Sequence, residues 1–274
     1  MDPHSNYRSL GPIESRVVLG LTEQGRRELT RQEAMERFAL GESTVNEVLS
    51  NLVRKGWLAR ASHGKYLLIP AEWGATPTSE SNTLALAAQL TPDGYIAFST
   101  AAAHWGLTTQ VRNVVWIVTR THARARRIND SDIRFARLPT KSLFGFERVP
   151  VFGYPVPMSD LEKTALDCIE YPERAGGLPE ASAILAKAVR RWDWEKAVDY
   201  FERRGNTALI QKSGYLCDAG HLSMPDAIRV RLHNRMKPSS RTYLVPRRHS
   251  EPYQHYDREW GVVVNIDPHT LFEN

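Results

Sequence analysis

The sequence predicts an α+β protein of two domains, and three features of the chain carry that prediction. The first 70 residues alternate short helical patterns with a hairpin pattern. Residues 71–82 are rich in Pro, Ser, Thr and Gly, which is the composition of a linker. Strand-like runs and then a series of helical segments follow. We therefore expect an N-terminal domain at residues 1–70 and, at residues 83–274, a mixed α/β domain with a small sheet and several helices.

Two helical patterns open the N-terminal domain. Pro12 suits the first turn of a helix, whose inward residues would be Ile13, Val17, Val18 and Leu21. Thr30 and Glu33 have the spacing of a capping box for a second helix. The apolar side of that helix would consist of Ala34, Met35 and Phe38, and Leu40 and Gly41 would end it.

A third helix is expected at residues 43–55. Its apolar residues recur at i, i+3, i+4 and i+7 and predict one buried stripe, formed by Val45, Val48, Leu49 and Leu52. The other face is polar, with Thr44, Asn46, Glu47, Ser50, Asn51 and Arg54. Such side chains suit base edges and phosphates, because Asn can bond adenine through two atoms, Glu can accept from cytosine, and Ser or Thr can contact phosphate oxygens. This is the predicted recognition helix.

Two β-prone runs follow, at residues 57–61 and 65–69, around a turn with Gly64 at its tip. Helix, turn, helix and basic hairpin, in that order, predict a winged helix-turn-helix that binds DNA. The expected DNA contacts are Ser43, Thr44, Asn46, Glu47, Ser50, Asn51, Arg54 and Lys55 on the helix, and Arg60, His63 and Lys65 on the hairpin. In the alternative interpretation the unit binds proteins, and its polar face is only solvated.

The charge distribution indicates a second basic surface. A formal charge of +5 and a pI near 9.2 favour an anionic partner. Cations are concentrated between Arg120 and Arg148, and the predicted loop at residues 121–130 holds Arg124, Arg126 and Arg127. These three arginines would contact DNA phosphate, RNA or an acidic partner, or else form a solvated turn.

The C-terminal domain should contain a sheet and then helices. Residues 113–119 form an apolar run typical of a central strand, further strands are expected at 132–138 and 146–149, and 151–157 suits a sheet edge or a connection. A helix at 83–90, a helix capped by Ser99 and a helix capped by Ser159 or Asp160 are also predicted. Helices at 180–190, 193–204, 207–218 and 225–236 would follow, and a closing strand near residues 262–266 would add to the sheet.

Composition limits the classes of function. With 42% hydrophobic and 24% charged residues, the chain resembles a soluble globular protein, and it has neither a secretory signal nor an apolar run long enough to span a membrane. Cys168 and Cys217 are expected to be buried free thiols in the cytoplasm. We expect no membrane partner.

No enzyme is predicted, and no cofactor or metal. Asp160, Glu162 and Lys163 resemble nuclease carboxylates, but they fall on one predicted helix, where an N-cap and a solvated ion pair explain them. A packed His104 is expected rather than a ligand, and His249, His255 and His269 have no fixed spacing. Trp192, Trp194 and Trp260 are interpreted as core or interface residues.

The C-terminal domain resembles the AbiEi family, which comprises antitoxins and transcriptional regulators of bacterial abortive-infection (type IV) toxin–antitoxin systems. The blocks that carry the resemblance are residues 95–108 (YIAFSTAAAHWGLT), the strand at 114–118, residues 159–168 (SDLEKTALDC), and the short motifs at 172–178, 205–206, 214–216 and 256–267. With the N-terminal winged helix-turn-helix, the resemblance covers nearly the whole chain.

The resemblance implies a repressor that binds double-stranded DNA at repeats upstream of its own operon. It also implies an antiviral defence role in which the C-terminal domain opposes a nucleotidyltransferase-like toxin without forming a stable complex. Two alternatives remain open on the residues alone. One is an enzyme acting on nucleic acids or nucleotides, tethered to a helix-turn-helix, and the other is a protein-binding adaptor.

Overall fold

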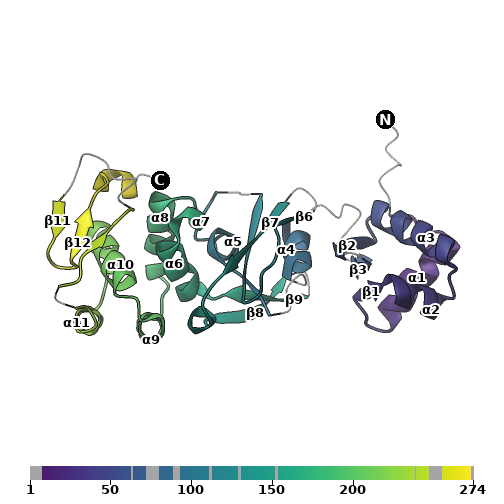
Figure 1. Cartoon of the computed structure of the whole chain (residues 1–274), viewed down its shortest axis with the longest axis horizontal. Coiled ribbons are helices and arrows are strands. Elements are labelled where there is room, and N and C mark those ends of the chain that lie inside the picture. The colour runs from purple at the N-terminus through teal and green to yellow at the C-terminus, as the bar shows by residue number, and fades with distance from the viewer. Residues whose placement is uncertain are drawn as a thin grey trace. The chain divides into compact units, whose positions relative to one another are not determined.

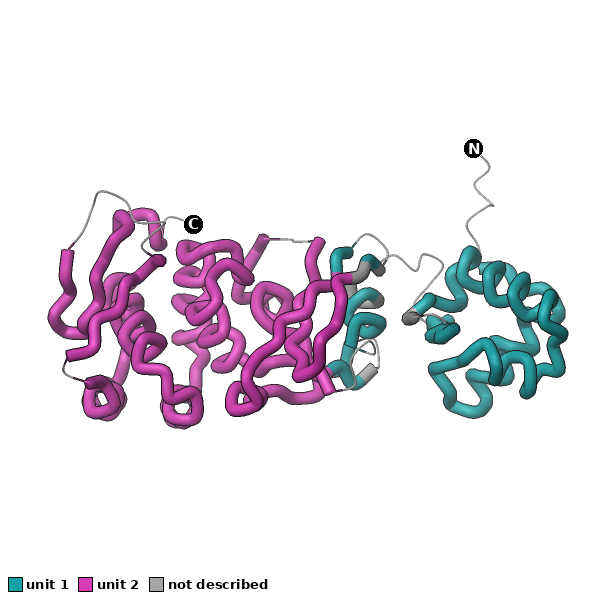
Figure 2. The backbone as a smooth tube through the Cα atoms, in the orientation of Figure 1, with its two compact units in different colours: residues 1–92, 126–132, 150–156 teal, residues 93–125, 133–149, 157–274 magenta. Residues whose placement is uncertain are grey.

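The computed structural model (Figure 1) describes residues 8–62, 64–71, 80–88, 93–110, 113–128, 131–151, 154–237, 239–246 and 255–272. The chain divides into two compact units (Figure 2). The N-terminal unit comprises residues 1–92 with 126–132 and 150–156, and the second unit comprises the remainder. The fold is mixed α and β, as predicted. Within the described ranges, no helix has the length and apolarity needed to cross a membrane.

The N-terminal unit begins with a module of three helices and three strands. Its elements are α1 (Pro12–Glu23), β1 (Glu28–Thr30), α2 (Arg31–Phe38), α3 (Glu42–Arg54), β2 (Leu58–Ser62) and β3 (Lys65–Leu68). The strands form an antiparallel sheet in the order β1-β3-β2. The three predicted helices and the hairpin are confirmed, whereas β1 was not predicted. Helix α4 (Glu80–Ala88) follows and agrees with the helix expected at 83–90.

Local capping explains where α2 begins and ends. The Glu33 amide donates to Thr30 Oγ1 (3.1 Å) and the Thr30 amide donates to Glu33 Oε2 (2.8 Å), so the predicted capping box is confirmed. The Thr30 amide bond and the ion pair with Arg26 outweigh the opposing effect of burial and lower the pKa of Glu33. Ala39 ends the helix in the left-handed region, with φ 51°.

The core of this module lies between α1, α2, α3 and the sheet. Its members include Val17, Leu21, Leu29, Ala34 and the four predicted stripe residues of α3, all buried. Ile13, predicted to point inward, is 41% exposed instead. The stripe of α1 runs 14, 17, 18 and 21, so Glu14 occupies the inward position of the first turn.

The main sheet has six strands in the order β6-β7-β5-β4-β9-β8. These are β4 (Tyr95–Ile96), β5 (Val114–Thr119), β6 (Arg126–Ile128), β7 (Ser131–Arg137), β8 (Phe146–Val151) and β9 (Tyr154–Ser159). The predicted central strand is confirmed, because β5 lies third in the order. Strand β4 pairs antiparallel with β5 and parallel with β9.

Three predictions for this region are wrong. Residues 151–157 were expected to be a sheet edge or a connection, but from Tyr154 on they belong to the inner strand β9. Its prolines are tolerated because the pairing with β4 involves Met158, beyond Pro155 and Pro157. Ser99 is buried inside α5 (Phe98–His104), whose N-cap is Ala97. The closing strand β12 (Val262–Val264) joins β10 (Thr242–Tyr243) and β11 (His255–Asp257) in a separate three-stranded sheet.

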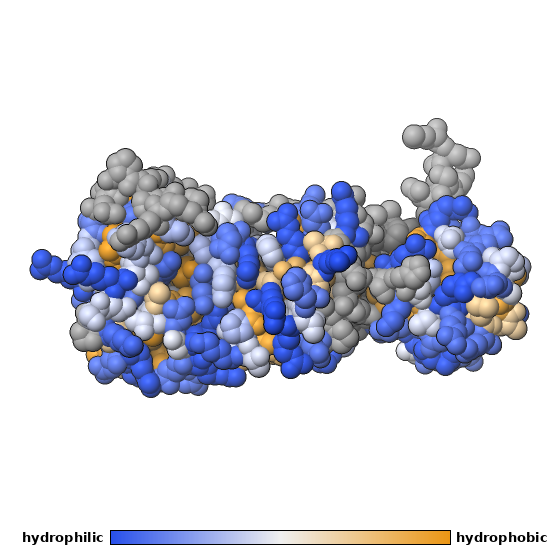
Figure 3. Space-filling view, viewed as in Figure 1, coloured by the Kyte–Doolittle hydropathy of each residue, from blue (hydrophilic) through white to orange (hydrophobic). Residues whose placement is uncertain are grey.

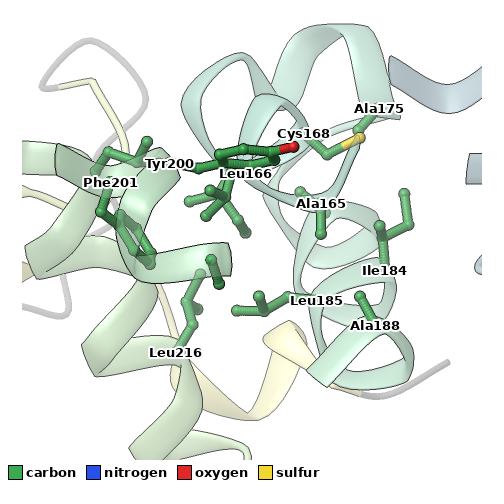
Figure 4. Close-up of a cluster of buried hydrophobic side chains, with 14 of the residues drawn as sticks. Ala165, Leu166, Cys168, Ala175, Ile184, Leu185, Ala188, Tyr200, Phe201 and Leu216 are labelled. Atoms are coloured by element: carbon green, nitrogen blue, oxygen red, sulfur yellow. The ribbon is translucent and has the colours of Figure 1, made fainter. Parts of the chain in front are cut away.

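Helices form the rest of the second unit and enclose its core. They are α6 (Leu161–Glu170), α7 (Pro172–Ala175), α8 (Leu178–Val189), α9 (Trp194–Arg204), α10 (Thr207–Ala219) and α11 (Asp226–His233), and the short 3-10 helices are η2 (Thr140–Ser142) and η4 (Pro268–Leu271). Figure 4 shows apolar side chains of α6, α8, α9 and α10 turned toward one another, among them Leu166, Leu185 and Leu216. Both cysteines are buried and free, as predicted.

Candidate nucleic-acid interface

Helix α3 has one buried and one exposed face. Val45, Val48, Leu49 and Leu52 are all at most 6% exposed. The opposite face contains five of the predicted contacts, all exposed: Ser43, Asn46, Glu47, Ser50 and Arg54. Thr44 and Asn51 are half-buried at the margins of this face. Hydrophilic residues cover most of the molecular surface that is visible in Figure 3.

Arg31, the first residue of α2, contacts the N-terminal part of this exposed face. Its Nε donates to Asn46 Oδ1 (2.9 Å), and its Nη2 lies 3.1 Å from Glu42 Oε1. The guanidinium therefore fixes the Asn46 side chain and offsets the charge of Glu42. Sequence reasoning missed Arg31, although a cation at the start of the helix before a predicted recognition helix was a usable signal.

A second arginine holds the other asparagine. Arg54 Nη2 donates to Asn51 Oδ1 at 2.7 Å, one turn apart on α3. In both pairs the arginine engages the amide oxygen of the asparagine, so the amide nitrogen is the group left to donate outward. The exposed face consequently combines two oriented amides with the hydroxyl of Ser50 and the carboxylate of Glu47.

Lys55 differs from the other predicted contacts. Its ammonium lies 2.6 Å from Glu14 Oε2, and the same carboxylate oxygen accepts from the Gly11 amide at 2.7 Å. Burial opposes ionisation of Glu14, but the Gly11 amide and the Lys55 ammonium together lower its pKa. Lys55 thus joins the end of α3 to the start of α1, and its contact with DNA stays a prediction.

The hairpin contributes two exposed cations. Arg60 and Lys65 are exposed, and Arg60 Nη2 lies 3.4 Å from the Tyr66 hydroxyl. The carbonyl of Gly64, which has φ 71°, accepts from the Arg31 amide at 2.9 Å and connects the hairpin turn to the start of α2. His63, the remaining predicted hairpin contact, lies outside the described residues.

The predicted second basic surface is described in part. Arg124 and Arg127 are exposed, whereas the side chain of Arg126 lies outside the described residues. Arg120, at the start of the basic region, forms an ion pair of 3.2 Å with Asp93. The structure therefore places two of the three predicted arginines at the surface.

At the start of α6, the prediction of a solvated ion pair between Glu162 and Lys163 is wrong. Asp160 caps the helix, as predicted, by accepting from the Lys163 amide at 2.9 Å. Glu162 and Lys163, predicted to be a solvated pair, are buried at 4% and 0% exposure. They are also not paired with each other, since Glu162 binds Lys196 (2.8 Å) and Lys163 binds Asp167. Helix α9 covers this side of α6, which no local pattern indicated.

The remaining candidate residues are the histidines and tryptophans of the second unit. Among the described residues, no group of three or more His, Cys, Asp and Glu side chains is arranged to hold a metal ion. His104, expected to be packed or hydrogen-bonded, is exposed at the end of α5, where its ring lies edge-to-face against Trp105 and partial burial lowers its pKa. Trp192 and Trp260 are buried, as predicted, and Trp194 packs against Trp192. His255 and His269 are exposed, and His249 lies outside the described residues.

Comparison with known proteins places this fold in a class rather than in a family. No family model and no curated protein matches the chain. A solved structure, that of the RV2827C protein from Mycobacterium tuberculosis, is similar with a TM-score of 0.66 and 18% sequence identity. The match covers 95% of this chain and 94% of that chain. The similarity concerns the mixed α and β fold over nearly its full length.

Proposed function

We propose that this protein is a DNA-binding transcriptional repressor whose N-terminal module is a winged helix-turn-helix. The observation that carries the proposal is the exposed polar face of α3, opposite a fully buried apolar stripe. A helix of 13 residues is about 20 Å long, enough to lie along a major groove while its other side remains in the core. The two arginine–asparagine bonds orient the polar side chains before DNA arrives.

The hairpin supplies the positioning contacts in this proposal. Arg60 and Lys65 are exposed cations that would pair with backbone phosphates beside the groove. Phosphate contacts add affinity for all sequences and depend on salt, whereas contacts from α3 to base edges discriminate between sequences. The module thus separates binding strength from base preference.

We further propose that the chain is a cytoplasmic antitoxin of the AbiEi kind, which represses its own operon and counteracts a nucleotidyltransferase-like toxin without a stable complex. The support is the resemblance of residues 159–168, which form the capped and buried start of α6 in the core of the second unit. This block would preserve the fold of the antitoxin domain, and the toxin-opposing surface would lie elsewhere on that unit.

Binding to duplex DNA from the protein's own promoter tests the first proposal. We expect Asn51→Ala to lose about 1–3 kcal/mol of discrimination at one base pair. Lys65→Ala should weaken all sequences alike and reduce the slope of log K against log salt by about 0.9. Arg190→Ala, which removes an exposed arginine of the second unit, is the charge-matched control. A promoter footprint that is unchanged by Asn51→Ala would refute the assignment of the recognition face.

Separation of the two activities tests the second proposal. The full-length double variant Arg54→Ala/Lys65→Ala should lose repression of a promoter reporter but still protect cells that express the toxin encoded next to it. Loss of protection in a variant that folds normally would contradict an antitoxin function located in the second unit.

A further inference from the structure

We propose that the second unit carries a separate site for single-stranded nucleic acid, centred on Arg174. The guanidinium of Arg174 lies in a box of three aromatic rings, hereafter the arginine box. Its Cζ is 4.5 Å from the ring centroid of Tyr171, 4.9 Å from that of Phe98 and 5.6 Å from that of Trp116. Aromatic faces attract a cation but leave its N–H donors available to an anion.

One donor of Arg174 is left without a hydrogen-bond partner by the described residues around it. Its Nη1 is buried and has no hydrogen-bond partner among the described residues, although the side chain as a whole is 20% exposed. The carboxylate of Glu173 is the ionic contact recorded for it, at 3.7 Å from Nε, which is beyond hydrogen-bond distance. A mostly buried guanidinium with an unpaired donor is costly unless an acceptor completes the site, and an anionic acceptor gives the strongest hydrogen bond to a guanidinium.

Further cations surround the arginine box. Arg134, on β7, has its guanidinium carbon 5.9 Å from the Trp116 ring centroid, so Trp116 is shared by two arginines. Lys212 on α10 is half-buried and interacts electrostatically with Glu173. These two cations add to the positive charge of Arg174, and a ligand that carries negative charge would be attracted to this part of the surface.

The arginine box is held in a fixed geometry. Phe98 has φ 55°, a left-handed conformation that is strained for a bulky side chain, and its ring packs edge-to-face against both Trp116 and Tyr171. Thr100 Oγ1 accepts from the Trp116 amide at 3.0 Å and donates to the Val114 carbonyl at 3.2 Å, which joins α5 to β5. Backbone strain beside unsatisfied donors is typical of binding sites.

The chemistry of the arginine box selects the ligand. Trp116 and Tyr171 are partly exposed aromatics next to two guanidinium groups, the combination that binds bases by stacking and phosphates by charge. A base-paired duplex keeps its bases stacked inside and cannot offer them to aromatic side chains, whereas a single strand can. The inference is independent of the proposed operator binding by α3, because the two sites share no residue.

Fluorescence anisotropy of the full-length protein with labelled 12-nucleotide oligo(U) RNA and oligo(dT) DNA tests the site. We expect binding at low salt to one or both strands, and about tenfold weaker binding for Arg174→Ala and for Arg134→Ala. Each substitution should lower the salt slope by about 0.7. Arg190→Ala, which removes the exposed C-cap residue of α8, should bind like the wild type. Neither arginine box variant should change the affinity for duplex promoter DNA.

The arms of the experiment separate the possible results. Stronger binding of the RNA or of the DNA identifies which strand the site prefers. Equal binding by the wild type and by Arg134→Ala, which removes an exposed side chain, would overturn the proposal. So would complete displacement of both strands by millimolar inorganic phosphate, because the site would then take an isolated anion. Melting temperatures establish that any loss in Arg174→Ala is not unfolding.

Discussion

Replacement of Lys163 by methionine should destabilise the second unit strongly. The ammonium of Lys163 binds the carboxylate of Asp167 one turn later in α6, and both side chains are 1% exposed. Burial lowers the pKa of Lys163 against the opposing effect of Asp167, as expected for a desolvated ammonium. Among the described residues, Lys163→Met would leave the Asp167 carboxylate with Arg204, at 3.9 Å, as its remaining ion-pair partner.

The magnitude follows from the burial of the pair. Removal of one partner of a buried ion pair costs roughly 3–5 kcal/mol, whereas an exposed pair contributes about 0–1 kcal/mol. For a unit of this size, each kcal/mol lowers the melting temperature by about 2–4 °C, which gives a decrease of roughly 6–20 °C. Tryptophan fluorescence is a suitable signal, because Trp105, Trp116, Trp192, Trp194 and Trp260 all lie in the second unit.

A double variant provides the control for this prediction. Lys163→Met/Asp167→Leu removes both charges and replaces them with apolar groups, so most of the lost stability should return. Arg204 keeps its ion pair with Glu170 in that variant. If Lys163→Met costs less than about 1 kcal/mol in urea unfolding, the pair is hydrated and the reasoning is refuted.

Three further changes should alter stability. The folded-state pKa of Glu14 is below its usual value of 4.5, so the stability that ionised Glu14 contributes is present above pH 4.5 and is lost as pH falls through the lowered pKa. Glu14→Gln should therefore reduce the loss of stability in acid, which thermal unfolding at pH 3–7 would measure. Gly214→Ala should cost about 3 kcal/mol in urea unfolding, because a Cβ there would lie 2.2 Å from the Trp260 ring. Tyr200→Phe should cost about 2 kcal/mol, because its hydroxyl donates to Asp160 at 2.6 Å; an unchanged midpoint would exclude that bond.

The sequence predicted elements whose cause is local. The apolar stripe of α3 and the Thr30–Glu33 capping box depend on residues within one or two turns, and both were predicted. The inward position of Glu14 was not predicted, because it depends on Lys55, 41 residues away. The buried state of Glu162 likewise depends on contacts with Asp193 and Lys196 of the α9 region.

In the candidate site, too, local features could be predicted from the sequence, whereas contacts between elements could not. A period of 3.6 residues suffices to predict which side of α3 is exposed, but not how its side chains are engaged. The Arg31–Asn46 bond joins two helices, and the arginine box joins α5, β5 and α7, so neither follows from spacing along one element. Long-range packing decided both arrangements.

The two arginine–asparagine hydrogen bonds change the base preference that is expected for the proposed DNA binding. An asparagine that bonds adenine through two atoms uses both its oxygen and its nitrogen, but Arg31 and Arg54 already donate to the oxygens of Asn46 and Asn51, which makes these oxygens weaker acceptors for the adenine amino group. In this arrangement each amide offers its nitrogen as a donor, which matches the acceptors at purine N7, guanine O6 and thymine O4. Adenine would be preferred over guanine if an arginine moved to a phosphate and released the amide oxygen. A DNA phosphate and an asparagine would then compete for the same guanidinium, so that contact with the DNA backbone would affect base preference.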